Sequence, residues 1–152
     1  MRHLSKKWFS IAGLLLLISC SSGPSTSLIT ESLDTNSRGG KVFVVRDTGS
    51  MGLVYKISVT INGRSAGKVG MKGTAVGSST IGTNKVTVKM NGLGGIGMSD
   101  GIAFFEDLSG ERNRFFIIGL RQNLWSAELI LQEISEDQFR SKALNNKWTE
   151  YL

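Results

Sequence analysis

The sequence predicts a mainly β protein: a small antiparallel β-sandwich, or a partly open barrel, that ends in one short helix. Short runs of β-branched and aromatic residues recur along the chain, with turn-forming residues about every ten positions. One run, Leu53 to Ile61, alternates between apolar and polar side chains from Tyr55 onward, as a half-buried strand does. No helical periodicity separates the runs, which disfavours a parallel βαβ arrangement.

The first half of the chain carries the clearest strand patterns. Lys41 to Arg46 (KVFVVR) predicts a strand, and Asp47 to Gly52 predicts a loop. In the run Leu53 to Ile61, the apolar residues at positions 53, 55, 57, 59 and 61 share one face. Asn62-Gly63 follows, and this dipeptide between two strand-like runs is the strongest short-range hairpin signal. Arg64 to Val69 is then the returning strand.

The second half adds further short strands. Asn84 to Met90 alternates, so Val86, Val88 and Met90 are expected on its inner face. Gly92 to Gly101 (GLGGIGMSDG) predicts a glycine-rich loop. The remaining strand runs and the turn between two of them are Lys72 to Val76 (the weakest), Ile102 to Glu106, the turn Asp107 to Asn113, Arg114 to Ile118, and Leu124 to Ile134 as one long strand or a bent pair.

A short helix is expected after the last strand. Ser135 and Gln138 match a capping box, in which a hydroxyl and an amide three residues later satisfy free backbone N–H groups. The helix runs to about Leu144, with Phe139 and Ala143 on its packed side. Beyond it, the sequence leaves two alternatives for the apolar residues Trp148, Tyr151 and Leu152, which either pack back on the domain or stay loose.

The first twenty residues form a processing signal. Arg2, Lys6 and Lys7 precede an apolar run, Trp8 to Ile18, that is about half the ~20 residues a membrane-spanning helix needs. The run ends in Leu17-Ile18-Ser19-Cys20, which resembles the lipobox of bacterial lipoproteins. An ordinary signal peptide with a chance cysteine, or an uncleaved apolar anchor, is the alternative.

The lipobox resemblance implies a diacylglycerol thioether on Cys20 and cleavage between Ser19 and Cys20. It divides the chain into a signal peptide (1–19), a lipidated cysteine with a Ser-, Thr- and Gly-rich tether (20–40), and a β domain with its helix (41–152). Ser21 stands where an Asp commonly retains enteric-type lipoproteins in the inner membrane. We therefore expect a bacterial envelope protein of the outer membrane that faces the periplasm.

Composition excludes several chemistries. Removal of the signal lowers the formal charge from +6 to +3, and this modest excess does not indicate nucleic-acid binding. Cys20 is the only cysteine, and His3, the only histidine, leaves with the signal. The mature chain therefore lacks a Ser-His-Asp or Cys-His catalytic group and a thiolate or His-ligated metal site. We expect no cofactor, no metal and no enzymatic activity.

The glycine-rich loop contains the pattern GxGxxG at Gly92, Gly94 and Gly97. A dinucleotide site needs a helix to open at this point, whereas a strand is expected to follow, so no nucleotide binding is predicted. The apolar loop residues Leu93, Ile96 and Met98 form a candidate contact surface for a partner.

The remaining candidates are better explained by structure. The acidic pairs Glu106-Asp107 and Glu136-Asp137 are neighbours in sequence; strand neighbours point to opposite faces, and acids near a helix start favour its dipole. No set of oxygen ligands has calcium-site spacing. Tyr55 and Trp125 are expected to pack on strands.

Between Lys41 and Leu144 the chain resembles a family of small bacterial lipoproteins that carry a β-sandwich domain of unknown function. The resemblance lies in the segments KVFVVR ending at Arg46, YKISVTING, Gly67-Lys68-Val69, NKVTVK and LILQEISEDQFRSKAL. Family members often carry Pro-Gly-Lys-His where this chain has Gly82-Thr83-Asn84-Lys85, so the proline and the histidine are absent here. The family implies a fold and a location but no activity.

The sequence therefore favours a non-enzymatic envelope lipoprotein that contacts another envelope protein. The alternative is a periplasmic glycan or small-ligand binder, which would show a groove lined by Tyr55, Trp125 or Trp148. A carboxylate hydrolase, the third alternative, would show two carboxyl groups facing each other at ~5 to 9.5 Å across a cleft.

Overall fold

The computed structural model describes residues 40–48, 55–71, 73–95, 97–124 and 126–144. Its elements in chain order are β1 (Lys41–Arg46), β2 (Ile57–Ile61), β3 (Arg64–Val69), β4 (Thr74–Ser78), β5 (Gly82–Met90), the 3-10 turn η1 (Gly92–Gly95), β6 (Met98–Ser99), β7 (Gly101–Asp107), β8 (Arg114–Gln122), β9 (Ala127–Ile134) and the helix α2 (Glu136–Leu144). The predicted mainly β class with a short C-terminal helix is confirmed.

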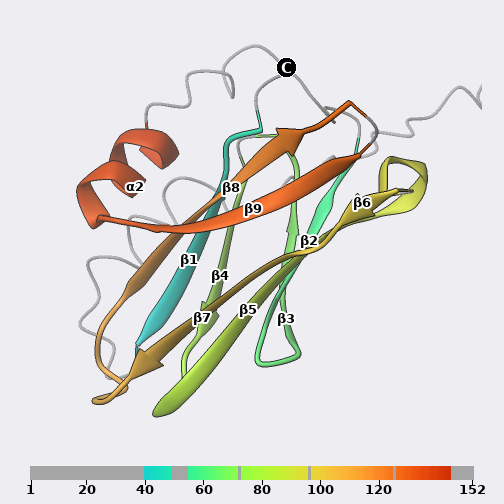
Figure 1. The fold of residues 1–152 in the computed structure, drawn as a ribbon. Helices are drawn as coiled ribbons and strands as arrows, with labels where there is room; N and C mark the ends of the chain where they lie inside the picture. Colours follow the sequence, from blue (N-terminus) through green and yellow to red (C-terminus); the bar gives the residue numbers. More distant parts are fainter. Residues whose placement is uncertain (1–39, 49–54, 72, 96, 125, 145–152) are drawn as a thin grey trace, which may run out of the picture.

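The strands form two facing sheets (Figure 1). Sheet A has the order β4-β1-β8-β9-β6 and sheet B the order β3-β2-β5-β7. The chain passes from one sheet to the other between β6, which pairs with β9, and β7, which pairs with β5. This passage joins the two sheets along one side, so the sandwich curls like half of a barrel.

Two strand pairs depart from the predicted antiparallel arrangement. β1 runs parallel to β8, and the short β6 runs parallel to β9, whereas the other pairs are antiparallel. The reason is that β1 inserts between β4 and β8, two strands that run in opposite directions. A central strand so placed must be parallel to one of its neighbours.

The inner faces of the two sheets form the main core. From sheet B, β2 contributes Ile57, Val59 and Ile61, and β5 contributes Val86, Val88 and Met90, all of them buried. These are the residues that the alternating pattern placed inward, so this prediction is confirmed. From sheet A the facing residues are Val42, Val44, Ala75, Phe116, Ile118 and Leu129.

β1 is buried on both of its faces. Val42 and Val44 belong to the main core, while Phe43 and Val45 belong to a second cluster under α2. An uninterrupted apolar run such as VFVV suits a central strand covered on both sides.

At the end of β1, the buried Arg46 donates from Nε to Thr48 Oγ1 (2.9 Å) and from Nη1 to the Tyr55 carbonyl (2.6 Å). Burial lowers the pKa of Arg46.

The helix α2 closes the outer face of sheet A. Its predicted capping box is formed: Gln138 N donates to Ser135 Oγ (3.2 Å), and Ser135 N donates to Gln138 Oε1 (3.0 Å). The Phe139 ring lies 5.6 Å from that of Phe43 and 5.1 Å from that of Phe115, centroid to centroid. Phe139 and Ala143 are buried, as the sequence predicted.

The predicted hairpin at Asn62-Gly63 is also confirmed. Both residues have positive φ, 51° and 77°, as the tight turn requires, and β2 pairs antiparallel with β3 across it. Gly63 has no Cβ, which removes the steric cost of a positive φ at this position.

Several strand limits differ from the prediction because local turns displace them. β4 begins at Thr74, after a turn in which Gly73 N donates to Gly70 O. β9 begins at Ala127, after a turn in which Asn123 N donates to Ser126 O. β2 begins at Ile57, after the described residues Tyr55 and Lys56, and its predicted start at Leu53 lies outside the described residues.

We predict that Phe139→Ala destabilises the domain by about 3 kcal/mol, because the change empties the aromatic cluster between α2 and sheet A. Urea unfolding measures the loss. Ser141→Ala, on the exposed side of the same helix, is the matched control and should change stability little. A loss below about 1 kcal/mol for Phe139→Ala would mean that α2 contributes little to the cooperative unit.

Candidate functional site

The predicted contact loop is more structured than expected. Within Gly92 to Gly101, the chain forms η1 and then β6, which pairs with β9 through Met98 and Ser99. The Met98 side chain is half-buried and packs against the main core, and its contact with a partner stays a prediction. Ile96 and the side chain of Leu93 lie outside the described residues. Strands follow the glycines, as predicted, where a nucleotide site needs a helix.

The two neighbouring acids at the end of β7 point to opposite sides of the sheet. Glu106 is exposed, whereas Asp107 is buried and accepts hydrogen bonds from Ser79 Oγ (2.7 Å) and Gly110 N (2.8 Å). The Ser79 hydroxyl, with backbone N–H groups and Arg114, holds the pKa of Asp107 below its ordinary value. Asp107 therefore fixes two turns, as the sequence predicted for a turn residue.

Asn84 lies in β5, two residues after its first residue, Gly82. Its buried side chain accepts from Asn62 Nδ2 and Thr80 N, both at 2.8 Å, and donates to the carbonyls of Thr80 (2.7 Å) and Gly82 (2.9 Å). Both ends of the amide are therefore satisfied. The network ties the β4–β5 turn to the tip of the β2–β3 hairpin.

A polar groove of about 530 Å³ lies beside this network, where the edge strands β3 and β4 of the two sheets face each other. Its apolar floor includes Ile61, Ala66 and Gly77. A Cβ at position 77 would collide with Ile61 Cδ1, so a larger residue there would have to displace the end of the Ile61 side chain on the groove floor. The polar lining consists of Asn62, Arg64, Ser65, Ser78, Ser79, Thr80 and Thr83.

The outer face of sheet B is the second candidate surface. Strand alternation places lysines and hydroxyl residues there: Ser58 and Thr60 of β2, Ser65 and Lys68 of β3, and Thr83, Lys85, Thr87 and Lys89 of β5. Lys68, Ser58 and Lys89 are register partners in one row across three strands. On β7, Ile102, Phe104 and Glu106 complete the face.

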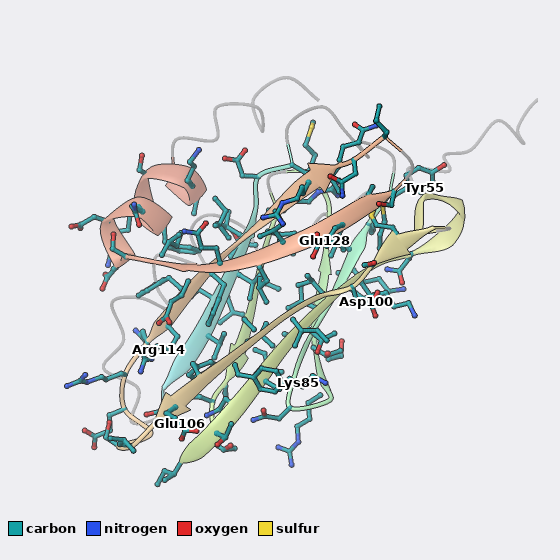
Figure 2. All side chains as sticks on the ribbon, in the orientation of Figure 1. Tyr55, Lys85, Asp100, Glu106, Arg114 and Glu128 are labelled. Carbon is teal, nitrogen blue, oxygen red and sulfur yellow. The ribbon has the colours of Figure 1, made fainter. Side chains whose placement is uncertain are left out.

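The charges of the two sheets are arranged differently. Among the described residues, the four ion pairs all involve sheet A or α2 and the segments next to them: Arg114–Glu133, Arg121–Glu128, Arg140–Glu136 and Lys142–Asp47. None of these pairs includes Lys68, Lys85 or Lys89. Figure 2 shows Lys85 on β5 and Glu106 at the end of β7, both on the sheet B side. With the exposed Asp100 just before β7, the lysines Lys68, Lys85 and Lys89 face two acids, so this side of sheet B keeps a small excess of positive charge.

Exposed apolar side chains gather on the same face. Phe104 is 66% exposed, and Lys85 Nζ lies 5.8 Å from the centroid of its ring. Ile102 is 49% exposed on the same strand. Ile81 and Leu108, 74% and 89% exposed, directly flank the last ladder pair of β5 and β7, Gly82 with Asp107. Four of the six large exposed apolar residues in the described ranges thus lie in this ladder or directly beside it.

The other predicted site residues do not come together. Tyr55 is half-buried and packs against the main core, as predicted, and it does not line the groove. Ser19, Cys20, Trp125 and Trp148 lie outside the described residues. In the described ranges, no group of three or more His, Cys, Asp or Glu side chains is placed to hold a metal ion. The helix found there is too short and polar to span a bilayer.

The sequence reasoning missed the Asn84 network and the apolar series along β7. The segment IAFF at 102–105 is apolar at four consecutive positions, so it carries no alternation to separate inner from outer residues. No protein-family profile matches the sequence, and no curated protein matches it either.

Asp107 makes the domain sensitive to acid. Its folded pKa is lowered, so its contribution to stability is present above the unfolded pKa of about 3.9 and is lost as pH falls through the folded pKa. We predict that Asp107→Asn lowers the urea midpoint at pH 7 and that the difference from wild type narrows toward pH 3. Glu111→Gln, at an exposed position in the same turn, is the control. If the difference in urea midpoint between wild type and Asp107→Asn did not change with pH, an electrostatic role of the Asp107 carboxylate would be contradicted.

Proposed function

We propose that this protein is a lipid-anchored lipoprotein of the bacterial cell envelope whose β-sandwich is a non-enzymatic interaction module. The observation that carries the proposal is the order of three signals in the first twenty residues: positive charges, a short apolar run, and Leu17-Ile18-Ser19-Cys20. Acylation of Cys20 would hold the chain on a membrane, because each buried CH2 contributes about 0.8 kcal/mol.

The absence of Asp after the cysteine supports the outer membrane and its periplasmic side as the location. The tether from Ser21 to Gly40 would hold the domain close to that surface. Membership of the lipoprotein family with a domain of unknown function belongs to the same proposal, and it is supported by the segments that resemble the family and by the β-sandwich.

An interaction role is supported by the distribution of charged and apolar side chains. The buried side chains of Asp107 and Asn84 form hydrogen bonds with neighbouring groups, so both residues stabilise the fold. The outer face of sheet B instead exposes lysines outside the ion pairs of the described residues, together with Ile102 and Phe104. Contiguous exposed apolar residues that are rimmed by polar ones mark contact surfaces, and Ile102 and Phe104 are alternate residues on one face of β7.

The anchor is tested with Cys20→Ala. We expect the wild-type chain to incorporate labelled palmitate and to sediment with membranes, and the Cys20→Ala chain to lose both properties. Ser21→Ala, the neighbouring residue, is the matched control and should retain them. Crosslinking in intact envelopes then identifies a protein that is recovered with wild type and lost with Cys20→Ala. Equal membrane retention of Cys20→Ala without label would refute the lipoprotein assignment.

A second candidate function, binding of a small ligand, is favoured by the polar groove. The described lining contains hydroxyl, amide and guanidinium groups but no aromatic ring for sugar stacking, which favours a small polar ligand with an acidic group facing Arg64.

We predict that titration with phosphate or acetate shifts the amide resonances of the groove residues and that Arg64→Gln weakens this binding about tenfold. Arg121→Gln, on sheet A, is the control and should leave the titration unchanged. Shifts that are spread over the surface, or that persist in Arg64→Gln, would exclude the groove as a ligand site.

A further inference from the structure

The exposed apolar residues of sheet B continue along β7 to one end of the sandwich. Ile102 and Phe104 occupy alternate positions on β7, and Leu108 directly follows the strand. Ile81 precedes β5 and lies beside the β7–β8 turn, because a Cβ at Gly110 would meet Ile81 Cγ1 at 3.1 Å. Ile81 and Leu108 therefore share the end of the domain where β5 begins and β7 ends, at the lower left of Figure 1.

The chain enters the domain at this same end. Gly40 N donates to the Gly110 carbonyl, and Ser79 N donates to the Gly40 carbonyl at 3.0 Å. β1 then starts at Lys41 and runs away from this end, parallel to β8. The sequence between Cys20 and Lys41 spans at most about 70 Å when fully extended. An anchor on Cys20 therefore keeps Ile81 and Leu108 within reach of a membrane.

The face next to this end carries positive charge. Lys85 lies over the Phe104 ring, and Lys68 and Lys89 share a row with Ser58. Two acids accompany these lysines. Glu106 is bonded to the Thr83 hydroxyl, and its backbone carbonyl accepts from Arg114 Nη2 at 2.9 Å, while the exposed Asp100 directly precedes β7. Lysines beside exposed apolar residues suit the surface of a bilayer with anionic headgroups, where their stems cover apolar groups while the amines remain hydrated.

We propose that the outer face of sheet B, with Ile81 and Leu108 at its leading end, lies on the surface of a membrane that contains anionic lipids. The inference rests on the proposed anchor at Cys20, and it adds a defined orientation of the anchored domain on the membrane. Three features support a membrane as the occupant: the entry of the chain beside Ile81, the apolar residues at that end, and the excess of lysines on the adjoining face. Leu124, in the β8–β9 turn of sheet A at the opposite end of the domain, then lies farther from the bilayer than Leu108.

The test uses the full mature lipoprotein in vesicles, with a fluorescent reporter on a single introduced cysteine. Acylation blocks the thiol of Cys20, so Leu108→Cys and Leu124→Cys each carry one label. Both positions are highly exposed, 89% and 95%, and lie at opposite ends, which makes them a matched pair. Vesicles contain either phosphatidylcholine alone or phosphatidylcholine with about 30% phosphatidylglycerol, plus spin-labelled lipid as quencher.

We expect strong quenching at position 108 with phosphatidylglycerol and little at position 124. Each lysine contributes about fivefold to the ratio of membrane-docked to undocked domain. The triple variant Lys68→Gln, Lys85→Gln, Lys89→Gln should therefore reduce this ratio about 100-fold. Replacing Arg121, Arg140 and Lys142 with Gln removes the same charge from the other side and should leave the quenching pattern unchanged. Thermal unfolding confirms that each variant is folded.

Equal quenching at the two positions, or none at either, would overturn the proposal. So would loss of a crosslinked protein partner in the sheet B variant without lipid quenching in wild type, because the face would then bind an acidic protein. The mass of the purified chain reports separately whether Cys20 is acylated, so failure of the anchor is distinguishable from failure of the orientation.

Discussion

The fold depends on the burial of β1 on both faces. Val42 and Val44 close the main core from the side of sheet A, while Phe43 and Val45 form the floor on which α2 packs. The same strand supplies backbone pairs to β4 on one edge, through residues 41–45, and to β8 on the other, through residues 42–46. One strand therefore connects both hydrophobic clusters and the centre of the larger sheet. Burial of apolar area at about 25 cal/mol per Å² makes such a strand a large contributor to stability.

Arg114 links the two sheets where β7 and β9 diverge, on the side that the β6–β7 passage closes at the other end. From β8 its Nη1 bonds Glu133 on β9, and its Nη2 bonds the Glu106 carbonyl on β7, both at 2.9 Å. Its guanidinium lies 5.5 Å from the centroid of the Phe105 ring. Figure 2 shows Arg114 on the side where β7 and β9 diverge. The buried Nε makes no hydrogen bond, so this tie has the cost of one unsatisfied donor.

Local signals predicted most of the elements. The alternation in β2 and β5, the Asn62-Gly63 turn and the Ser135–Gln138 capping box each involve residues a few positions apart, and each has the predicted geometry. The strand limits that differ from the prediction lie at turns such as Asn123 to Ser126, where the turn hydrogen bond outweighs strand propensity. Propensity acts as a weak prior that tertiary context overrides.

Long-range pairing could not be predicted from sequence, and the candidate surface depends on it. The parallel β1–β8 and β6–β9 ladders join segments distant in sequence, which leave no local pattern. β6 shows the consequence: pairing with β9 turns a predicted contact residue, Met98, toward the core. The register of β5 with β7 does the reverse, setting Lys85 opposite the exposed Phe104. The full chain has a net charge of +6, and the strand registers place Lys68, Lys85 and Lys89 on one face of sheet B, whereas sheet A pairs its arginines with carboxylates.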